Sequence, residues 1–113
     1  MSHLDRTLAA LADPTRRGVI DLLRVRPRSA GELADELGKT APAMSRHLRV
    51  LRVEGLVTED HSGDDARVRV YRLRPERFRE LHTWVRAVES FWAAELDAFK
   101  AHAERTRGKR ARS

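Results

Sequence analysis

The stretch APAMSRHLRVLRVEGL, residues 41–56, decides the fold predicted for this chain. At about 100° per residue of a helix, Met44, Leu48 and Leu51 fall on one side, which must be the buried side. The residues of the first two turns that face away from it are Pro42, Ser45, Arg46 and Arg49. Residues 39–53 include four basic residues and no acidic one. Packing against a core does not require such an outer face, so it needs another explanation.

The residues just before this stretch predict a helix and a short turn. Ser29 and Glu32 have the spacing of a capping box, in which each residue satisfies a backbone N–H group of the other, so a helix begins there. Gly38 ends that helix as a left-handed C-cap, and Thr40 caps the next one, with Pro42 in its first turn. A break this short between two helices is typical of a helix-turn-helix unit.

Two further helices are predicted closer to the N-terminus. The first is indicated by three leucines at helical spacing, Leu4, Leu8 and Leu11. Asp13 is a good N-cap and Pro14 a good first-turn residue, so a second helix begins there. Pro27 disfavours helical backbone at the residue before it and ends that helix.

The pattern changes after residue 56. Residues 56–73 have β-branched runs on both sides of a polar segment, 62–65, and predict a two-stranded hairpin. Pro75 then opens a last helix of about thirty residues, which is recognised by its apolar period. The members of this apolar stripe are Phe78, Leu81, Val85, Val88, Trp92, Leu96 and Phe99. The predicted fold is mainly α with a small β-hairpin, a winged helix-turn-helix with helices added at both ends.

Charge is concentrated at the C-terminus. The formal net charge of the 113 residues is +6, with 23 basic and 17 acidic residues. The segment RTRGKRARS, residues 105–113, holds five of the basic residues, and the remaining 18 nearly balance the 17 acids. We expect residues 1–104 to form one domain and residues 105–113 a disordered basic tail, which is either a solvated end or a sequence-independent phosphate contact.

Composition excludes several classes of protein. The chain has no cysteine, so disulfides, thiolate metal sites and cysteine nucleophiles are excluded. No apolar run approaches the roughly 18 residues that span a bilayer, and no signal pattern begins the chain, so a cytoplasmic protein without membrane contact is expected. No glycine-rich phosphate loop and no catalytic constellation is present, so neither an enzyme nor a cofactor is expected.

The outer face of residues 41–54 suits the major groove of double-stranded DNA. Arginine forms two hydrogen bonds with the O6 and N7 atoms of guanine, and serine donates to a phosphate or a base edge. The alternative is a solvated arginine face, which surface helices often show. His47 falls only about 60° from the buried side, so we expect it to pack or to contact phosphate rather than to read a base.

The hairpin is the predicted wing. Arg67 and Arg69 share a face with Tyr71 and Leu73 because side chains alternate along a strand. Tyr71 and Leu73 are expected to pack inward, and the two arginines to reach DNA, while the acidic tip at 64–65 stays away from phosphate. The alternative is a charged edge that prevents pairing with other strands.

Four segments together resemble the ArsR family of bacterial winged-helix repressors. They are LADPTRRGVIDLL, AGELADELG, APAMSRHLRVLRVEGLV and YRL, and the resemblance covers nearly all of the chain before the tail. It implies a homodimer that represses an operator, usually near its own gene, with the first and last helices as dimerisation helices. The implied DNA contacts are Thr40, Ala41, Pro42, Ser45, Arg46 and His47. Ala41 departs from the glutamine or serine common in the family, so one hydrogen bond is missing.

The resemblance also directs attention to dimerisation and sensing. The expected dimer interface consists of Leu4, Leu8, Leu81, Val85, Val88, Trp92 and Phe99. The family's Cys-x-Cys metal site falls on Ser29 and Gly31, and its last-helix site has Ala93 where a histidine is expected, so no metal is predicted. Trp84 and Trp92 either fill the dimer interface or line a small-molecule pocket, and the inducer is unknown.

These observations predict a homodimeric, sequence-specific DNA-binding repressor. One alternative is a non-specific, basic nucleic-acid-binding protein, for which the tail is the main support. Another is a ligand-responsive regulator with a pocket near Trp84 and Trp92. A winged-helix module that does not bind DNA is disfavoured by the positive charge of residues 39–53.

Overall fold

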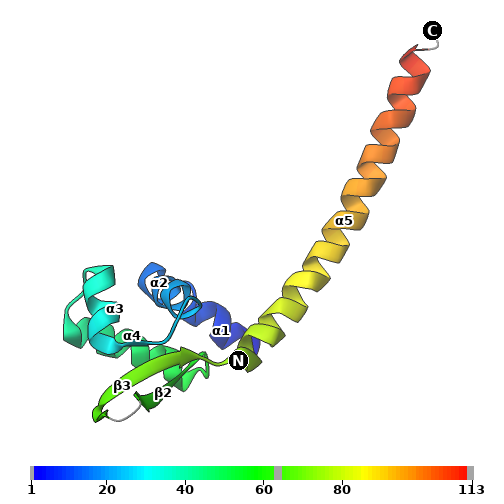
Figure 1. The fold of residues 1–113 in the computed structure, drawn as a ribbon. Helices are drawn as coiled ribbons and strands as arrows, with labels where there is room; N and C mark the ends of the chain where they lie inside the picture. The colour runs from blue at the N-terminus through cyan, green and yellow to red at the C-terminus, as the bar shows by residue number, and fades with distance from the viewer. Residues whose placement is uncertain (1, 63–64, 112–113) are drawn as a thin grey trace. The chain divides into compact units, whose positions relative to one another are not determined.

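The computed structural model describes the backbone of residues 2–62 and 65–111, and the chain divides into two compact units, 1–81 and 82–113 (Figure 1). The helices are α1 (His3–Ala10), α2 (Pro14–Leu23), α3 (Ala30–Leu37), α4 (Ala41–Val53) and α5 (Pro75–Ala111). The strands are β1 (Arg28–Ser29), β2 (Val57–Ser62) and β3 (Asp65–Leu73). The first unit holds all of these elements except most of α5. The order of helices and strands confirms the predicted, mainly helical winged helix-turn-helix.

The helix-turn-helix begins and ends where the local sequence chemistry predicts. The Glu32 backbone N–H donates to Ser29 Oγ at 3.2 Å, and the Ser29 N–H donates to Glu32 Oε1 at 3.3 Å, which is the predicted capping box of α3. Gly38 ends α3 at φ +63°, a left-handed conformation that glycine adopts without steric cost. The Ala43 N–H donates to Thr40 Oγ1 at 3.2 Å at the start of α4.

The hydrophobic core lies between the helices and the sheet of the first unit. Met44, Leu48 and Leu51 are all at most 1% exposed, as their predicted side of the helix requires. They pack in one buried cluster with Val19 of α2, Leu33 of α3, Val57 of β2 and Leu56, which precedes β2. Tyr71 and Leu73 pack against this cluster, which confirms that their face of β3 points inward.

The sheet has three strands, and the prediction of a two-stranded hairpin was therefore incomplete. The strand order is β1-β3-β2 and all pairs are antiparallel. Arg28 lies opposite Tyr71, and Ser29 lies opposite Val70. A strand of two residues has no detectable period, and Ser29 is also the N-cap of α3, so the sequence indicated only the helix. Residues 63–64 of the predicted hairpin tip lie outside the described residues.

The last helix is longer than predicted. It begins at Pro75, as expected, but continues to Ala111, through residues that were predicted to form a disordered tail. Arginine, lysine and alanine are good helix formers, and Gly108 is the only glycine in this segment, so the chain has little reason to leave the helix there. No helix within the described ranges is long and apolar enough to cross a membrane. The boundary between residues 104 and 105 stays a prediction.

Candidate nucleic-acid interface

The outer face of α4 is exposed along its first two turns. Pro42, Ser45, Arg46 and Arg49 are all exposed, and so are Thr40 and Ala41 at the helix start. Neither Arg46 nor Arg49 has a hydrogen-bond or ion-pair partner among the residues that the structure describes. Both guanidinium groups therefore point into solvent with all their donors available, on the side of the helix opposite Met44 and Leu48.

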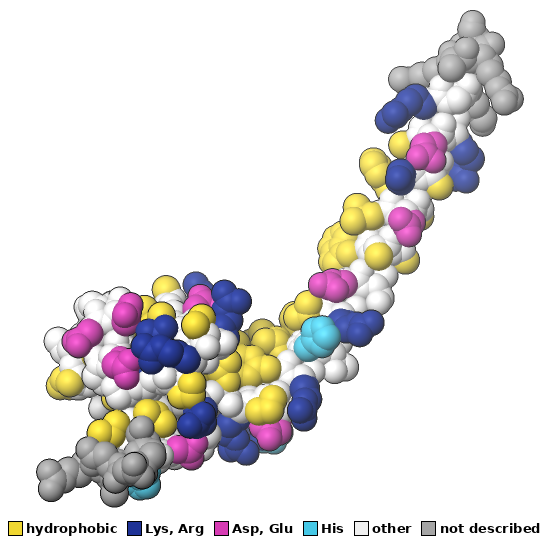
Figure 2. Space-filling model, in the orientation of Figure 1, with side chains coloured by type: hydrophobic (Ala, Val, Ile, Leu, Met, Phe, Trp, Pro, Cys, Tyr) yellow, Lys and Arg dark blue, Asp and Glu magenta, His cyan; other side chains and the backbone are white. Residues whose placement is uncertain are grey.

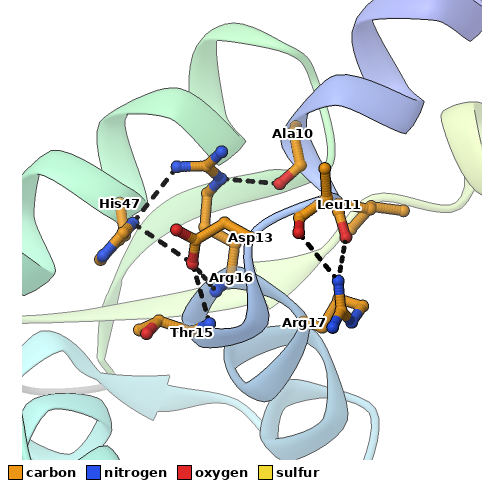
Figure 3. A network of polar contacts seen from close by, with 8 residues as sticks. Ala10, Leu11, Asp13, Thr15, Arg16, Arg17 and His47 are labelled. Atoms are coloured by element: carbon orange, nitrogen blue, oxygen red, sulfur yellow. Dashed lines mark hydrogen bonds and ion pairs between the residues drawn. The ribbon is translucent and has the colours of Figure 1, made fainter.

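His47 lies in a polar network that joins α4 to the start of α2 (Figure 3). Its side chain is only 21% exposed, and its Nδ1 lies 3.3 Å from Nη1 of Arg16 and 4.0 Å from Oδ1 of Asp13. Arg16 Nε also donates to the Ala10 carbonyl oxygen at 2.6 Å, so it bridges α1 and α4. His47 is therefore partly packed against the start of α2, and its expected contact with phosphate stays a prediction.

Asp13 organises the same network from the N-cap of α2. Its Oδ1 accepts the backbone N–H groups of Thr15 at 2.8 Å and Arg16 at 3.1 Å. The hydrogen bond from the Arg16 backbone, with smaller contributions from the charges of His47 and Arg16, holds the pKa of Asp13 below its usual value. The carboxylate is therefore ionised at neutral pH beside α4.

The wing arginines have different surroundings from those of α4. Arg69 Nη1 donates to Glu59 Oε1 at 3.0 Å, and Arg52 Nη1 donates to Glu59 Oε2 at 2.7 Å. The Arg69 side chain is 65% exposed, as expected for a residue that reaches DNA, but its guanidinium group is paired with Glu59. The side chain of Arg67 and the acidic tip at 64–65 lie outside the described side chains.

Sequence reasoning did not single out Glu59 or Arg52. Two signals were available. Strand alternation places Glu59 on the same face as the apolar Val57, which indicates the inward face of the hairpin. Arg52 lies on the flank of α4, about one turn after Arg49 along the helix. The contact between them depends on how α4 packs on β2, which no local pattern shows.

The predicted dimer-interface residues leave much apolar surface exposed in the single chain. In the first unit, Leu4 and Leu81 are half-buried and Leu8 is 37% exposed. In the second unit, Val85 and Val88 are half-buried, whereas Trp92 and Phe99 are 57% and 72% exposed. Figure 2 shows hydrophobic side chains along this part of α5. Trp84, at 45%, is also exposed.

A shallow cavity of about 260 Å³ lies between α1, α2 and α4. Its lining residues are Arg6, Ala9, Ala10, Arg16, Val50 and Glu54. Neither Trp84 nor Trp92 contributes to it. Within the described part of the chain, no three histidine or acidic residues gather in a way that could hold a metal ion.

A helix-turn-helix with an exposed basic second helix, next to an antiparallel hairpin, defines a winged helix-turn-helix DNA-binding protein. Comparison with known proteins agrees. The family model described as "Bacterial regulatory protein, arsR family" matches residues 13–59. The HTH-type transcriptional regulator Rv2034 of Mycobacterium tuberculosis is 38% identical over 95 residues, which is 84% of this chain and 83% of that protein.

Two solved structures show the same fold. The crystal structure of the ArsR family transcriptional regulator RHA00566 has a TM-score of 0.70 at 30% identity, covering 80% of this chain and 97% of that one. The homodimeric winged helix-turn-helix DNA-binding domain Mb0332 of Mycobacterium bovis, described as a possible ArsR-family regulator, has a TM-score of 0.61 at 27% identity, with 78% and 79% covered. The chain belongs to the ArsR family of DNA-binding transcriptional regulators. Because it contains no cysteine, it is not a thiolate metal sensor.

Proposed function

We propose that this regulator is a sequence-specific repressor that binds its operator as a homodimer in the bacterial cytoplasm. In this proposal α4 enters the major groove and the β2–β3 hairpin lies beside it as the wing. The observation that carries it is the exposed pair Arg46 and Arg49, which have no partner among the described residues. The proposed DNA contacts are Thr40, Pro42, Ser45, Arg46, His47, Arg49, Arg67 and Arg69.

The chemistry of α4 divides these contacts into two kinds. Arg46 and Arg49 have the donors for bidentate recognition of guanine, which discriminates against a wrong base by about 1–3 kcal/mol. Thr40 is the N-cap of α4, where the helix dipole and unpaired N–H groups favour a phosphate, and the Ser45 hydroxyl has a donor for a phosphate or a base edge. His47 already faces Arg16 with one ring nitrogen, so its other nitrogen is the one proposed to meet the DNA backbone.

The homodimer is supported by the apolar surface that a single chain leaves exposed. Large apolar patches on a soluble domain are normally covered by a partner. The proposed interface uses Leu4, Leu8, Leu81, Val85, Val88, Trp92 and Phe99. The related domain from Mycobacterium bovis is described as homodimeric. A two-fold symmetric dimer presents two copies of α4, so the operator is expected to contain inverted half-sites about 34 Å apart or a multiple of that spacing.

Fluorescence anisotropy tests the proposal, with the promoter of the regulator's own gene as the probe and a scrambled duplex of equal composition as the reference. We expect the promoter to bind at least 10³-fold more tightly at moderate salt. Equal affinities would refute sequence-specific recognition and assign the chain to the non-specific nucleic-acid-binding class.

The residue-level test replaces Arg46 with alanine. The loss is expected to be about 1–3 kcal/mol on the promoter and to relax the preference at one base pair. Arg24→Ala is the matched control, because Arg24 is the exposed C-cap residue of α2 and lies outside the proposed interface, with its Nε 3.7 Å from Asp21 Oδ1. A uniform loss on every sequence would instead assign Arg46 to a phosphate.

A further inference from the structure

Glu59 connects the two elements that are proposed to contact DNA. It lies on β2 opposite Tyr71, and its two carboxylate oxygens accept from two different arginines. Oε2 accepts from Arg52, on the last turn of α4, and Oε1 accepts from Arg69, on β3 of the wing. We call Glu59, Arg52 and Arg69 the Glu59 cluster.

The carboxylate of this cluster is much less exposed than its arginines. Only 14% of the Glu59 side chain is exposed, against 51% for Arg52 and 65% for Arg69. Burial by itself would raise the pKa of Glu59, but the hydrogen bonds and charges of Arg69 and Arg52 outweigh burial and hold this pKa below its usual value. The group therefore remains ionised at the pH at which the protein binds DNA.

One negative charge between two guanidinium groups changes what these arginines do near DNA. A phosphate that approaches either arginine competes with a carboxylate already held at 2.7 or 3.0 Å. Charge-assisted hydrogen bonds of this length are stronger than those between neutral groups, and most of the acceptor side chain is covered. Arg46 and Arg49 have no such competitor among the described residues. The arginines on the outer face of α4 are therefore available to DNA, whereas Arg52 on its flank is held by Glu59.

Building on the proposed function, we propose that Glu59 determines specificity by restraining Arg52 and Arg69, so that binding to arbitrary DNA makes less use of their charges. Non-specific affinity depends almost entirely on the number of phosphates that arginine and lysine neutralise. Withholding two guanidinium groups lowers this affinity. Specific binding is much less affected, because base contacts by Arg46 and Arg49 hold the wing against the operator, where Arg69 makes its proposed contact. Glu59 thereby increases the ratio of the affinity for the operator to the affinity for arbitrary DNA.

The test replaces Glu59 with glutamine and measures affinity for scrambled DNA over a range of salt concentrations. Each additional phosphate contact steepens the slope of log K against log salt by about 0.9 and tightens binding about 8-fold at 0.1 M salt. We expect E59Q to bind scrambled DNA about 8-fold to 60-fold more tightly, with a slope steeper by about one to two. The operator-to-scrambled ratio should fall.

Asp60→Asn is the matched control. Asp60 is the next residue of β2, on the opposite face of the strand, and it pairs with Arg72 at 3.1 Å. The substitution makes the same change in net charge without releasing Arg52 or Arg69. A smaller increase with D60N than with E59Q supports the proposal. An equal increase, whether from net charge or from the release of Arg72, would show that the effect is not particular to Arg52 and Arg69 and would overturn the proposal.

A second measurement does not depend on E59Q being folded. In the otherwise native chain, Arg52→Ala should leave the salt slope on scrambled DNA unchanged to within about 0.3, because Arg52 is restrained. A drop of about 0.9 would show that Arg52 already contacts phosphate and would refute the proposal. Wild-type binding to the promoter against scrambled DNA reports separately on the proposed function, so the two hypotheses can fail independently.

Discussion

Replacing Trp92 with alanine is expected to dissociate the proposed homodimer. A tryptophan side chain has up to about 250 Å² to bury, and 57% of Trp92 is exposed in the single chain, so about 140 Å² is available to a partner. At about 25 cal/mol per Å² this is worth about 3.5 kcal/mol, of which the smaller alanine side chain retains about 1 kcal/mol, so each substitution costs about 2.5 kcal/mol. A two-fold dimer contains the residue twice, so the upper estimate of the loss is about 5 kcal/mol, or a Kd raised by roughly 10³-fold to 10⁴-fold.

Sedimentation equilibrium over nanomolar to micromolar concentrations measures this change directly. Asp97→Ala is a suitable control, because Asp97 is exposed and lies about 140° around α5 from Trp92. Alanine is a better helix former than tryptophan, so a weaker dimer cannot be attributed to a weaker helix. A W92A dimer within about 3-fold of the wild-type Kd would refute the interface, and a wild-type chain that is monomeric at micromolar concentration would refute the dimer itself.

Three further predictions concern the scaffold that positions α4. Met44→Ala should lower the free energy of unfolding by about 2–5 kcal/mol in urea titration, because Met44 is 0% exposed; a loss below about 1 kcal/mol would contradict its place in the core. Ser29→Ala should cost about 1 kcal/mol in the same assay, since it removes the capping box of α3, and a neutral result would show that the cap is dispensable. The pKa of Asp13 is lower in the folded protein than in the unfolded chain, where it is near 3.8. The ionised carboxylate therefore adds to the free energy of unfolding above pH 3.8, and this contribution is lost as the pH falls through the folded pKa. Asp13→Asn should therefore destabilise the protein more at pH 7 than at pH 2, and an equal effect at both would rule out this linkage.

Features that depend on neighbours in sequence could be predicted without the structure. The caps at Ser29, Gly38 and Thr40 follow from backbone chemistry within three or four residues, and the structure has all three. The buried side of α4 follows from its helical period, which also placed His47 on the flank. That the flank position meets Arg16 and Asp13 could not be predicted, because those partners come from another helix.

Features that depend on packing between distant segments were missed. β1 exists because the chain before α3 lies against β3, and two residues carry no pattern of their own. The Glu59 cluster joins positions 52, 59 and 69, which approach one another only when α4 packs on the sheet.

Disorder of residues 105–111 was predicted from charge and a single glycine, whereas helix propensity favours the continuation of α5 that the structure has.

The pairing of β1 with β3 limits where this chain tolerates added residues. Ser29 is held at once by Val70 across the sheet and by Glu32 in the capping box of α3. An insertion before Arg28 lengthens only the connection from α2. An insertion between Ser29 and Ala30 separates the strand from the cap, and either the sheet or the helix loses a partner. A purification tag or a reporter peptide therefore belongs ahead of Arg28, although both positions lie within the same short connection.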